Sequence, residues 1–207
     1  MSIKAVVFDY GGVICFPPSV ETALELEHLT GLSSVQMEEL NRKYRWRYDK
    51  GTYNGEEYFR QILSKAGVFL DEESLRKIAQ TDMDGYKYLN PETIQLITDL
   101  KAEGVKTAIL SNMPVDFSVW ARKHLGVFGE VDAAIISGEH HLLKPETAIF
   151  EKLREELQLA YEEMIYFDDL PENIIRACEL GINGFVWINP NDARRALRKT
   201  DKVFALL

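Results

Sequence analysis

The chain has 207 residues, 46% of them hydrophobic and 28% charged, a composition that suits one globular core with an insertion. Its net charge of −9 argues against nucleic acid as a partner, because a phosphate backbone is itself negative. The sequence has no apolar stretch long enough for a membrane span, no signal-peptide pattern, and two cysteines without metal-site spacing, so we expect no membrane partner and a cytoplasmic location.

The first predicted element is a buried strand over residues 3–9, an apolar run rich in β-branched residues. It ends in Asp9, and Gly11 and Gly12 follow in a tight turn. Open α/β sheets bind ligands outside the carboxyl ends of their strands, so Asp9 lies where a functional carboxylate is expected. An aspartate that merely ends a strand is the alternative at this point.

Residues 17–86 form the next block, and their pattern is helical rather than alternating. Helices are expected near residues 19–29, 34–48, 55–66 and 72–83, two of them starting with capping-box spacing. Because the block directly follows the first strand, it leaves and re-enters above Asp9, where a lid belongs. We therefore predict a helical cap domain over 17–86 and a core domain over 1–16 and 87–207.

One cap segment, from Tyr44 to Lys50, mixes aromatic and cationic residues. Packing of the aromatic side chains inside the cap is the favoured interpretation. Substrate recognition by Arg45 or Arg47 is the second, and base stacking in a protein this acidic is the least favoured.

The second half of the chain alternates helix and strand. Strands are expected near 106–111, 132–136, 163–168 and 184–188, with helices near 115–124, 146–157 and 172–180 and a helix start at Asn90-Pro91. Such alternation predicts an α/β fold, a Rossmann-like parallel sheet with helices on both faces, which here also carries the inserted α-helical cap.

Polar residues follow three of these later segments. Ser111 and Asn112 end an apolar run, Lys144 precedes a proline-initiated amphipathic helix, and Asp168 and Asp169 end another strand. Each signal alone is weak, since such residues often cap helices or lie at the surface. Together with the aspartate of the first strand they make coincidence improbable, because all of them are expected near one edge of the sheet.

These residue types suit a divalent metal and a phosphate group. Mg²⁺ prefers carboxylate, carbonyl and water oxygens, and Lys144 can neutralise a phosphate as a point charge. Ser111, Asn112 and turn amides such as that of Gly12 can bond phosphate oxygens. Asp9 is then free to attack phosphorus and form an aspartyl-phosphate.

The chain resembles the haloacid dehalogenase-like superfamily, mainly its phosphatases. The resemblance covers nearly the whole chain, and the matching motifs are Phe8–Val13, Leu110–Asn112, Lys144–Pro145 and Asp168–Asp169 with Asn173. It implies that Asp9 is the nucleophile and that Ser111 and Lys144 hold the phosphoryl group, with Asn112 beside the substrate. It also implies that Asp169 and Asp168 position Mg²⁺ together with Asp9 and the main-chain carbonyl of Gly11.

Gly11 departs from the superfamily pattern. Most of these phosphatases have a second aspartate at this position, which protonates the leaving oxygen and activates water, a step typically worth about 10²–10⁴-fold in rate. Subgroups with Asp-x-Gly resemble this chain, including sugar-phosphate phosphatases and the N-terminal phosphatase domains of epoxide hydrolases. The glycine favours substrates with good leaving groups, or else a substrate hydroxyl, a water or a cap residue supplies the proton.

The resulting prediction is a Mg²⁺-dependent phosphatase that hydrolyses a small-molecule phosphate ester, such as a sugar phosphate, through an aspartyl-phosphate. A metal-free haloacid dehalogenase is one alternative, but adjacent carboxylates near Asp9 repel one another unless a cation lies between them. A non-catalytic or regulatory protein is the other, supported by Gly11 and opposed by the retained motifs. The sequence leaves the substrate and the oligomeric state open.

Overall fold

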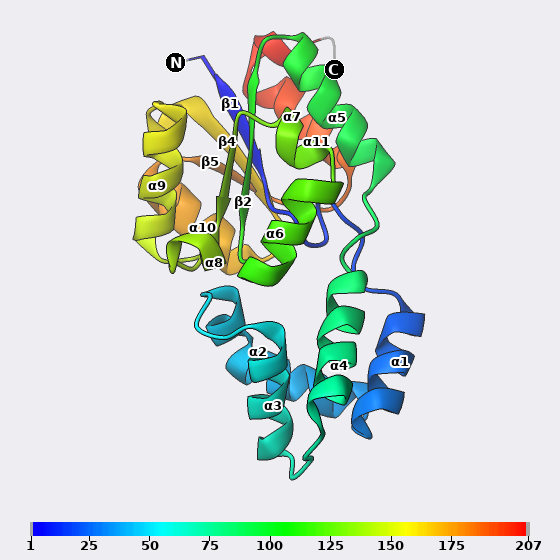
Figure 1. Ribbon diagram of the computed structural model, residues 1–207. Coiled ribbons are helices and arrows are strands. Elements are labelled where there is room, and N and C mark those ends of the chain that lie inside the picture. The colour runs from blue at the N-terminus through cyan, green and yellow to red at the C-terminus, as the bar shows by residue number, and fades with distance from the viewer. Residues whose placement is uncertain (1, 206–207) are drawn as a thin grey trace.

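The computed structural model describes residues 2–205. Its centre is a sheet of five parallel strands in the order β3-β2-β1-β4-β5 (Figure 1). The strands are β1 (Ala5–Phe8), β2 (Lys106–Ser111), β3 (Ala133–Ile136), β4 (Met164–Asp168) and β5 (Asn183–Val186). The predicted α/β fold with a parallel sheet is confirmed.

β1 lies in the middle of the sheet, and all four of its residues are buried, as expected of a strand that is covered on both faces. Its last residue, Phe8, is aligned with Ile109 of β2 and Phe167 of β4. The strands therefore end together. Asp9, which follows Phe8, lies beside Asp168 at the end of β4, and Ser111 ends β2 at the same edge.

Helices cover both faces of this sheet (Figure 1). Alternate residues of β1 point to opposite faces. Val6 and Phe8 join a buried cluster with α5 (Pro91–Ala102), α6 (Val115–His124), α7 (Val127–Glu130) and α11 (Pro190–Thr200). Ala5 and Val7 join a second cluster with α9 (Thr147–Leu157) and α10 (Pro171–Leu180). The sheet is thus held between two apolar layers, which makes its carboxyl edge a rigid platform.

Some helical elements of the core are absent from the sequence-based expectation. Helices α7 and α8 (Ser137–His140) have four residues each, too few for a helical period to be recognised. Helix α11 has 11 residues, but only Pro190, Ala193 and Leu197 are buried, so its apolar face is narrow. Two single 3₁₀ turns, η1 (Tyr161–Glu163) and η2 (Lys202–Phe204), complete the core.

The cap consists of α1 (Val20–Thr30), α2 (Ser34–Asp49), α3 (Gly55–Lys65) and α4 (Glu72–Asp84), close to the predicted helices. Capping boxes are present at the starts of α2 and α3. The four helices enclose their own apolar cluster, in which the rings of Tyr48 and Tyr58 stack at a centroid distance of 4.9 Å. Because it has a core of its own, we propose to treat residues 17–86 as a separate domain.

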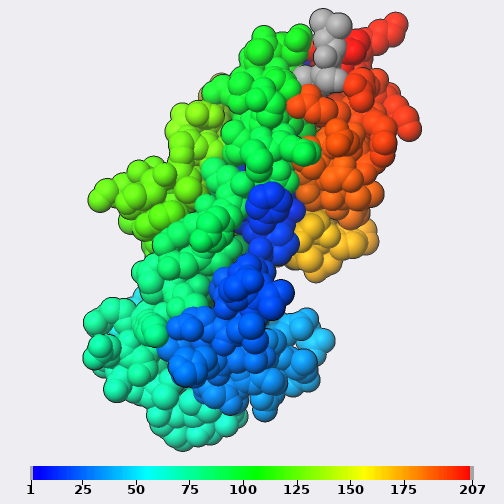
Figure 2. All heavy atoms as spheres, turned by 90° about the vertical axis from the view of Figure 1, so that its right-hand side faces the viewer, coloured from blue at the N-terminus to red at the C-terminus, as the bar shows by residue number. Residues whose placement is uncertain are grey.

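Two chain segments join the cap to the core, and they run antiparallel to each other. The amide of Phe16 donates to the carbonyl of Tyr88 at 2.9 Å, and the amide of Asn90 donates to the carbonyl of Ile14 at 2.8 Å. In Figure 2 the early blue segment and the green segment lie side by side between the two lobes. The cap is therefore attached to the core by two short, hydrogen-bonded chain segments.

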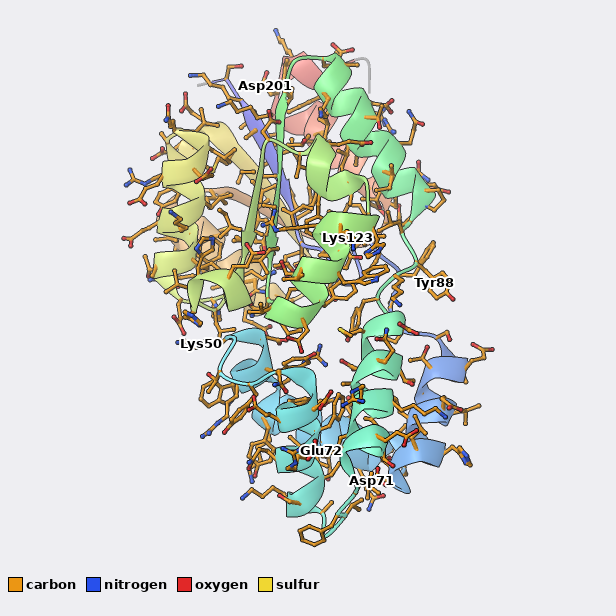
Figure 3. The ribbon with its side chains drawn as sticks, viewed as in Figure 1. Lys50, Asp71, Glu72, Tyr88, Lys123 and Asp201 are labelled. Carbon is orange, nitrogen blue, oxygen red and sulfur yellow. The ribbon has the colours of Figure 1, made fainter. Side chains whose placement is uncertain are left out.

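On the side away from these two connecting segments, the cap contacts the core through the C-terminal end of α2. Lys50, at the boundary in Figure 3, forms an ion pair with Glu146 at 3.1 Å. A Cβ atom on Gly51 would lie 2.6 Å from the carbonyl oxygen of Gly138 in α8, so only glycine allows this approach. The cap is thus seated over the carboxyl edge of the sheet.

Within residues 2–205, no helix combines the length and the apolar character needed to cross a bilayer.

Candidate active site

Asp9 lies directly after β1 and is 7% exposed. Its Oδ1 accepts a hydrogen bond from the amide of Tyr10 at 2.6 Å and lies 2.9 Å from Lys144 Nζ. Oδ2 has no hydrogen-bond partner in the described part of the chain. Burial raises the pKa of Asp9 to about 6 although Lys144 opposes this, and repulsion by Asp168 and Asp169 adds to the rise. One oxygen is thus fixed, and the other is available for chemistry or for a metal.

Lys144 is the charged centre of the site, with a side chain that is 1% exposed. Its ammonium lies 2.6 Å from Asp168 Oδ2 and donates to the carbonyl of Leu110 and the hydroxyl of Tyr166, both at 3.0 Å. Burial acts to lower the pKa of Lys144, but attraction to Asp9 and Asp168 outweighs it and the pKa is raised. The lysine is therefore held as a cation between two carboxylates.

Asp168 is fully buried and holds Lys144 in place. Its Oδ1 accepts from the amide of Leu170 at 2.8 Å and from Asn173 Nδ2 at 3.0 Å, and its Oδ2 also accepts from the Tyr166 hydroxyl. Burial acts to raise the pKa of Asp168, but Lys144 outweighs it and the pKa is lowered. With both oxygens occupied by donors, Asp168 is suited to orienting the lysine, and direct binding of a metal by this residue stays a prediction.

Asp9, Asp168 and Asp169 bring carboxylate oxygens within 4.8 Å of one another. Asp169 is the exposed member of the set, and the partial burial of its carboxyl group, followed by repulsion from Asp168, raises its pKa. The set contains oxygen donors and no nitrogen or sulfur ligand, which fits a hard cation such as Mg²⁺. A bound cation would also relieve the repulsion that these raised pKa values report.

The two glycines of the first loop differ in their requirements. Gly12 has a φ of 70°, and a Cβ there would lie 3.0 Å from Asp169 Oδ2, so glycine lets the loop approach this carboxylate. Gly11 does not have a positive φ, and no atom lies within 4 Å of a Cβ placed on it. The backbone therefore accepts a side chain at position 11, and the absence of the usual aspartate is not a steric necessity.

The predicted phosphate-binding pair divides into two roles. Ser111 is buried at the end of β2 and lines a cavity between the cap and the core. Asn112 also lines this cavity, but its amide group pairs with the main chain of Lys144, accepting at 2.8 Å and donating at 3.1 Å. Asn112 therefore fixes the position of Lys144, and its contact with substrate stays a prediction.

The cavity has a volume of about 180 Å³ and is closed on one side by cap residues that sequence reasoning largely missed. Arg45 lines it and pairs with Asp49 and with Asp82, each at 3.0 Å. Arg47, by contrast, is exposed and lines a separate cavity within the cap. The spacing of Arg45 and Asp49, four residues apart on one helix, was the available signal for the first pair, whereas nothing local points to Asp82.

The site combines a buried carboxylate at the end of β1, a buried lysine, adjacent carboxylates at the end of β4 and a helical cap, a combination typical of one class of hydrolase. The family model of the haloacid dehalogenase-like hydrolases matches residues 3–179, and the chain belongs to this family.

Individual relatives are more distant. The sesquiterpene phosphatase astK of Aspergillus oryzae is 27% identical over 190 residues, which cover 88% of this chain and 89% of that protein. A haloacid dehalogenase family enzyme of Bacteroides thetaiotaomicron is similar in structure, with a TM-score of 0.76 at 20% identity over 96% of this chain and 100% of that chain. The L-2-haloacid dehalogenase of Xanthobacter autotrophicus has a TM-score of 0.65 at 22% identity over 88% of this chain and 76% of that chain. At identities this low, the similarity to the solved structures shows the fold alone.

Proposed function

We propose that this hydrolase is a Mg²⁺-dependent phosphatase that acts on a small phosphate ester through an aspartyl-phosphate on Asp9. The observation that carries the proposal is the carboxylate cluster: Asp9, Asp168 and Asp169 bring oxygens within 4.8 Å of one another, and a buried lysine pairs with the first two. Two similar proteins support it. The A. oryzae relative is a phosphatase, and the B. thetaiotaomicron enzyme has been crystallised with magnesium and inorganic phosphate.

The residues of the chain have separable tasks in this reaction. Oδ2 of Asp9 attacks phosphorus while Oδ1 stays bonded to the amide of Tyr10. Lys144 and the hydroxyl of Ser111 hold the phosphoryl oxygens. Asp9, Asp169 and the carbonyl of Gly11 would hold Mg²⁺, which when bound neutralises negative charge on the phosphoryl group. Water then attacks the phosphorylated Asp9 and releases inorganic phosphate.

The cavity restricts the organic part of the substrate to a small group. Its volume is about 180 Å³. Asn41 can bond a hydroxyl group, and Met83 and Phe117 supply apolar wall. A small hydroxylated ester such as a sugar phosphate fits this lining, and we propose this class as the substrate.

Removal of divalent cations should abolish hydrolysis of p-nitrophenyl phosphate, and Mg²⁺ should restore it. Magnesium should also raise the melting temperature without substrate, because an ion at 100 times its dissociation constant adds about 2.7 kcal/mol to the free energy of unfolding. Calorimetry with and without chelator measures the second effect. Asp169→Asn is the control and should lose most of the stabilisation by Mg²⁺. Undiminished phosphatase turnover in excess chelator, or chloride release from a 2-haloacid under those conditions, would contradict the proposal.

A further inference from the structure

The loop after β1 lacks a proton donor where the reaction needs one. Gly11 lines the cavity, with open space where a Cβ atom would lie. The oxygen that leaves phosphorus becomes an alkoxide unless an acid protonates it, and for most alcohols this is the costly part of the reaction. A donor from another part of the molecule would have to enter the same cavity as Gly11 and Ser111.

Asp49, the last residue of α2, enters that cavity from the cap. Its side chain is 14% exposed. Its main-chain carbonyl accepts a hydrogen bond from Ser137 Oγ of α8 at 2.5 Å, and Ser137 Oγ in turn accepts from the amide of Met113, which follows β2. The core thus fixes the position of Asp49, although this residue belongs to a cap helix.

The contacts of the Asp49 carboxyl group leave one oxygen unpaired. Oδ1 accepts from Arg45 Nε at 3.0 Å, and within residues 2–205 no hydrogen bond reaches Oδ2. Arg45 also donates through Nη1 to both oxygens of Asp82, at 3.0 and 3.2 Å. The charge of the guanidinium is therefore shared between two carboxylates. It stabilises the ionised form of Asp49 less than it would if Asp49 were its single partner.

Other titratable groups around the cavity are committed elsewhere. Both oxygens of Asp82 are occupied by Arg45. The hydroxyl of Tyr10 donates to the carbonyl of Tyr86 at 2.7 Å. Burial raises the pKa of Tyr86 to about 12, which makes its hydroxyl a weak acid. Asp49 is the carboxyl group in this lining with a free oxygen.

We propose that Asp49 is the general acid and base of the reaction, supplied by the cap in place of the aspartate that position 11 lacks. This assignment rests on the proposed phosphatase function. In the first step Asp9 Oδ2 forms a bond to phosphorus, the ester P–O bond breaks, and the proton of the Asp49 carboxyl group passes to the leaving oxygen. In the second step the Asp49 carboxylate takes a proton from water, the water oxygen bonds to phosphorus, and the P–O bond to Asp9 breaks. The products are the alcohol and inorganic phosphate, and Asp49 is again protonated.

The electrostatic surroundings of Asp49 suit both halves of this cycle. Burial raises its pKa to about 6, and the nearby Asp82 adds to the rise, whereas Arg45 and Lys144 oppose it. A group that titrates near the operating pH can both give and accept a proton at useful rates.

The test compares wild type and Asp49→Asn on aryl phosphates of increasing leaving-group pKa, from p-nitrophenyl to phenyl, and on benzyl phosphate, whose leaving group is an alkoxide. The value of kcat/KM reports the first step. We expect a shallow dependence in wild type and a steep one in the variant, which should match wild type for p-nitrophenyl phosphate and fall by about 10²–10⁴-fold for benzyl phosphate. Because the second step also loses its base, the variant should release one equivalent of p-nitrophenolate in a burst and then turn over slowly.

Asp82→Asn is the matched control, because it removes the other carboxylate partner of Arg45 from the same cavity. It should keep the shallow dependence of wild type. If the plots of log kcat/KM against leaving-group pKa are parallel for wild type and Asp49→Asn, the role of Asp49 is wrong and the phosphatase function stands. A steep plot for wild type would also contradict this role, and that result does not depend on the folding of any variant. A wild type that hydrolyses none of the esters with Mg²⁺ present would overturn the phosphatase function and the role of Asp49 together.

The second variant returns the missing group to the loop. Because position 11 has room for a side chain and an ordinary φ, Gly11→Asp in the Asp49→Asn background should recover at least tenfold in kcat/KM for benzyl phosphate, within the about 10²–10⁴-fold that an acid supplies. No recovery in a variant that melts like wild type would count against a simple loss of the proton donor.

Discussion

Asp9→Asn should lower kcat by about 10⁴-fold or more for every phosphate ester that the wild type hydrolyses, because the amide that replaces the carboxylate does not attack phosphorus. Stopped-flow and long-time product assays together cover this range. A variant with near wild-type kcat would eliminate the covalent mechanism.

The same variant should not lose stability when no metal is bound. The pKa of Asp9 rises on folding from 3.8 to about 6, so the folded state binds the proton more tightly than the unfolded state. The contribution of Asp9 to stability is therefore fully present below pH 3.8 and is lost as the pH rises to about 6. Metal-free Asp9→Asn should show a weaker loss of stability over this interval than wild type, as measured by urea denaturation at several pH values.

Lys144→Met should have the second largest effect, on folding as well as on activity. The ammonium is the shared partner of two buried carboxylates, Asp9 and Asp168. Removing one member of a buried ion pair typically costs about 3–5 kcal/mol, because the remaining charge is left uncompensated. The free energy of unfolding at neutral pH should fall by this amount, and turnover should be lost because the phosphoryl oxygens lose the ammonium group that we propose holds them.

Two controls separate the buried charge from general damage. The double variant Lys144→Met with Asp168→Asn should recover part of the stability and none of the activity, because the unpaired charge is removed but the phosphate partner is not restored. Lys4→Met breaks the ion pair with Glu163, in which the lysine side chain is 57% exposed, and should cost at most about 1 kcal/mol. Equal losses for Lys4→Met and Lys144→Met would refute the assignment of Lys144 as a buried counter-ion.

Much of the core could be predicted because its signals are local. The apolar run before Asp9 and the one before Ser111 each end in a polar residue, and parallel pairing brings both ends to one edge. Cap helices α2 and α3 begin at capping boxes, which the spacing of three positions between Ser33 and Gln36 and between Asn54 and Glu57 already indicates. The prediction of the family, confirmed by the family model, rested on motifs of the same short range.

What could not be predicted depends on how distant segments dock. Asp49 and Asp82 are 33 positions apart in the sequence. Only the packing of α2 against the other cap helices gives them Arg45 as a common partner. Likewise, no local pattern indicates that Lys144, Tyr166 and the amide of Leu170 donate to the two oxygens of Asp168, and metal binding by this residue stays a prediction. Helix α11 was missed because its buried face is reduced to three residues.

The hydrogen bond from Ser137 to the carbonyl of Asp49 has a consequence for selectivity. If Asp49 moves the proton, closure of the cap and delivery of the acid are one event, since the residue whose main-chain carbonyl binds the core also carries the carboxyl group that reacts. An ester too bulky for the closed cavity keeps Asp49 away from its leaving oxygen, although the phosphorylated Asp9 that remains after the alcohol departs is the same for every substrate. Among bulky esters, only those with a good leaving group should therefore be hydrolysed, and their kcat/KM should depend steeply on leaving-group pKa even in the wild type.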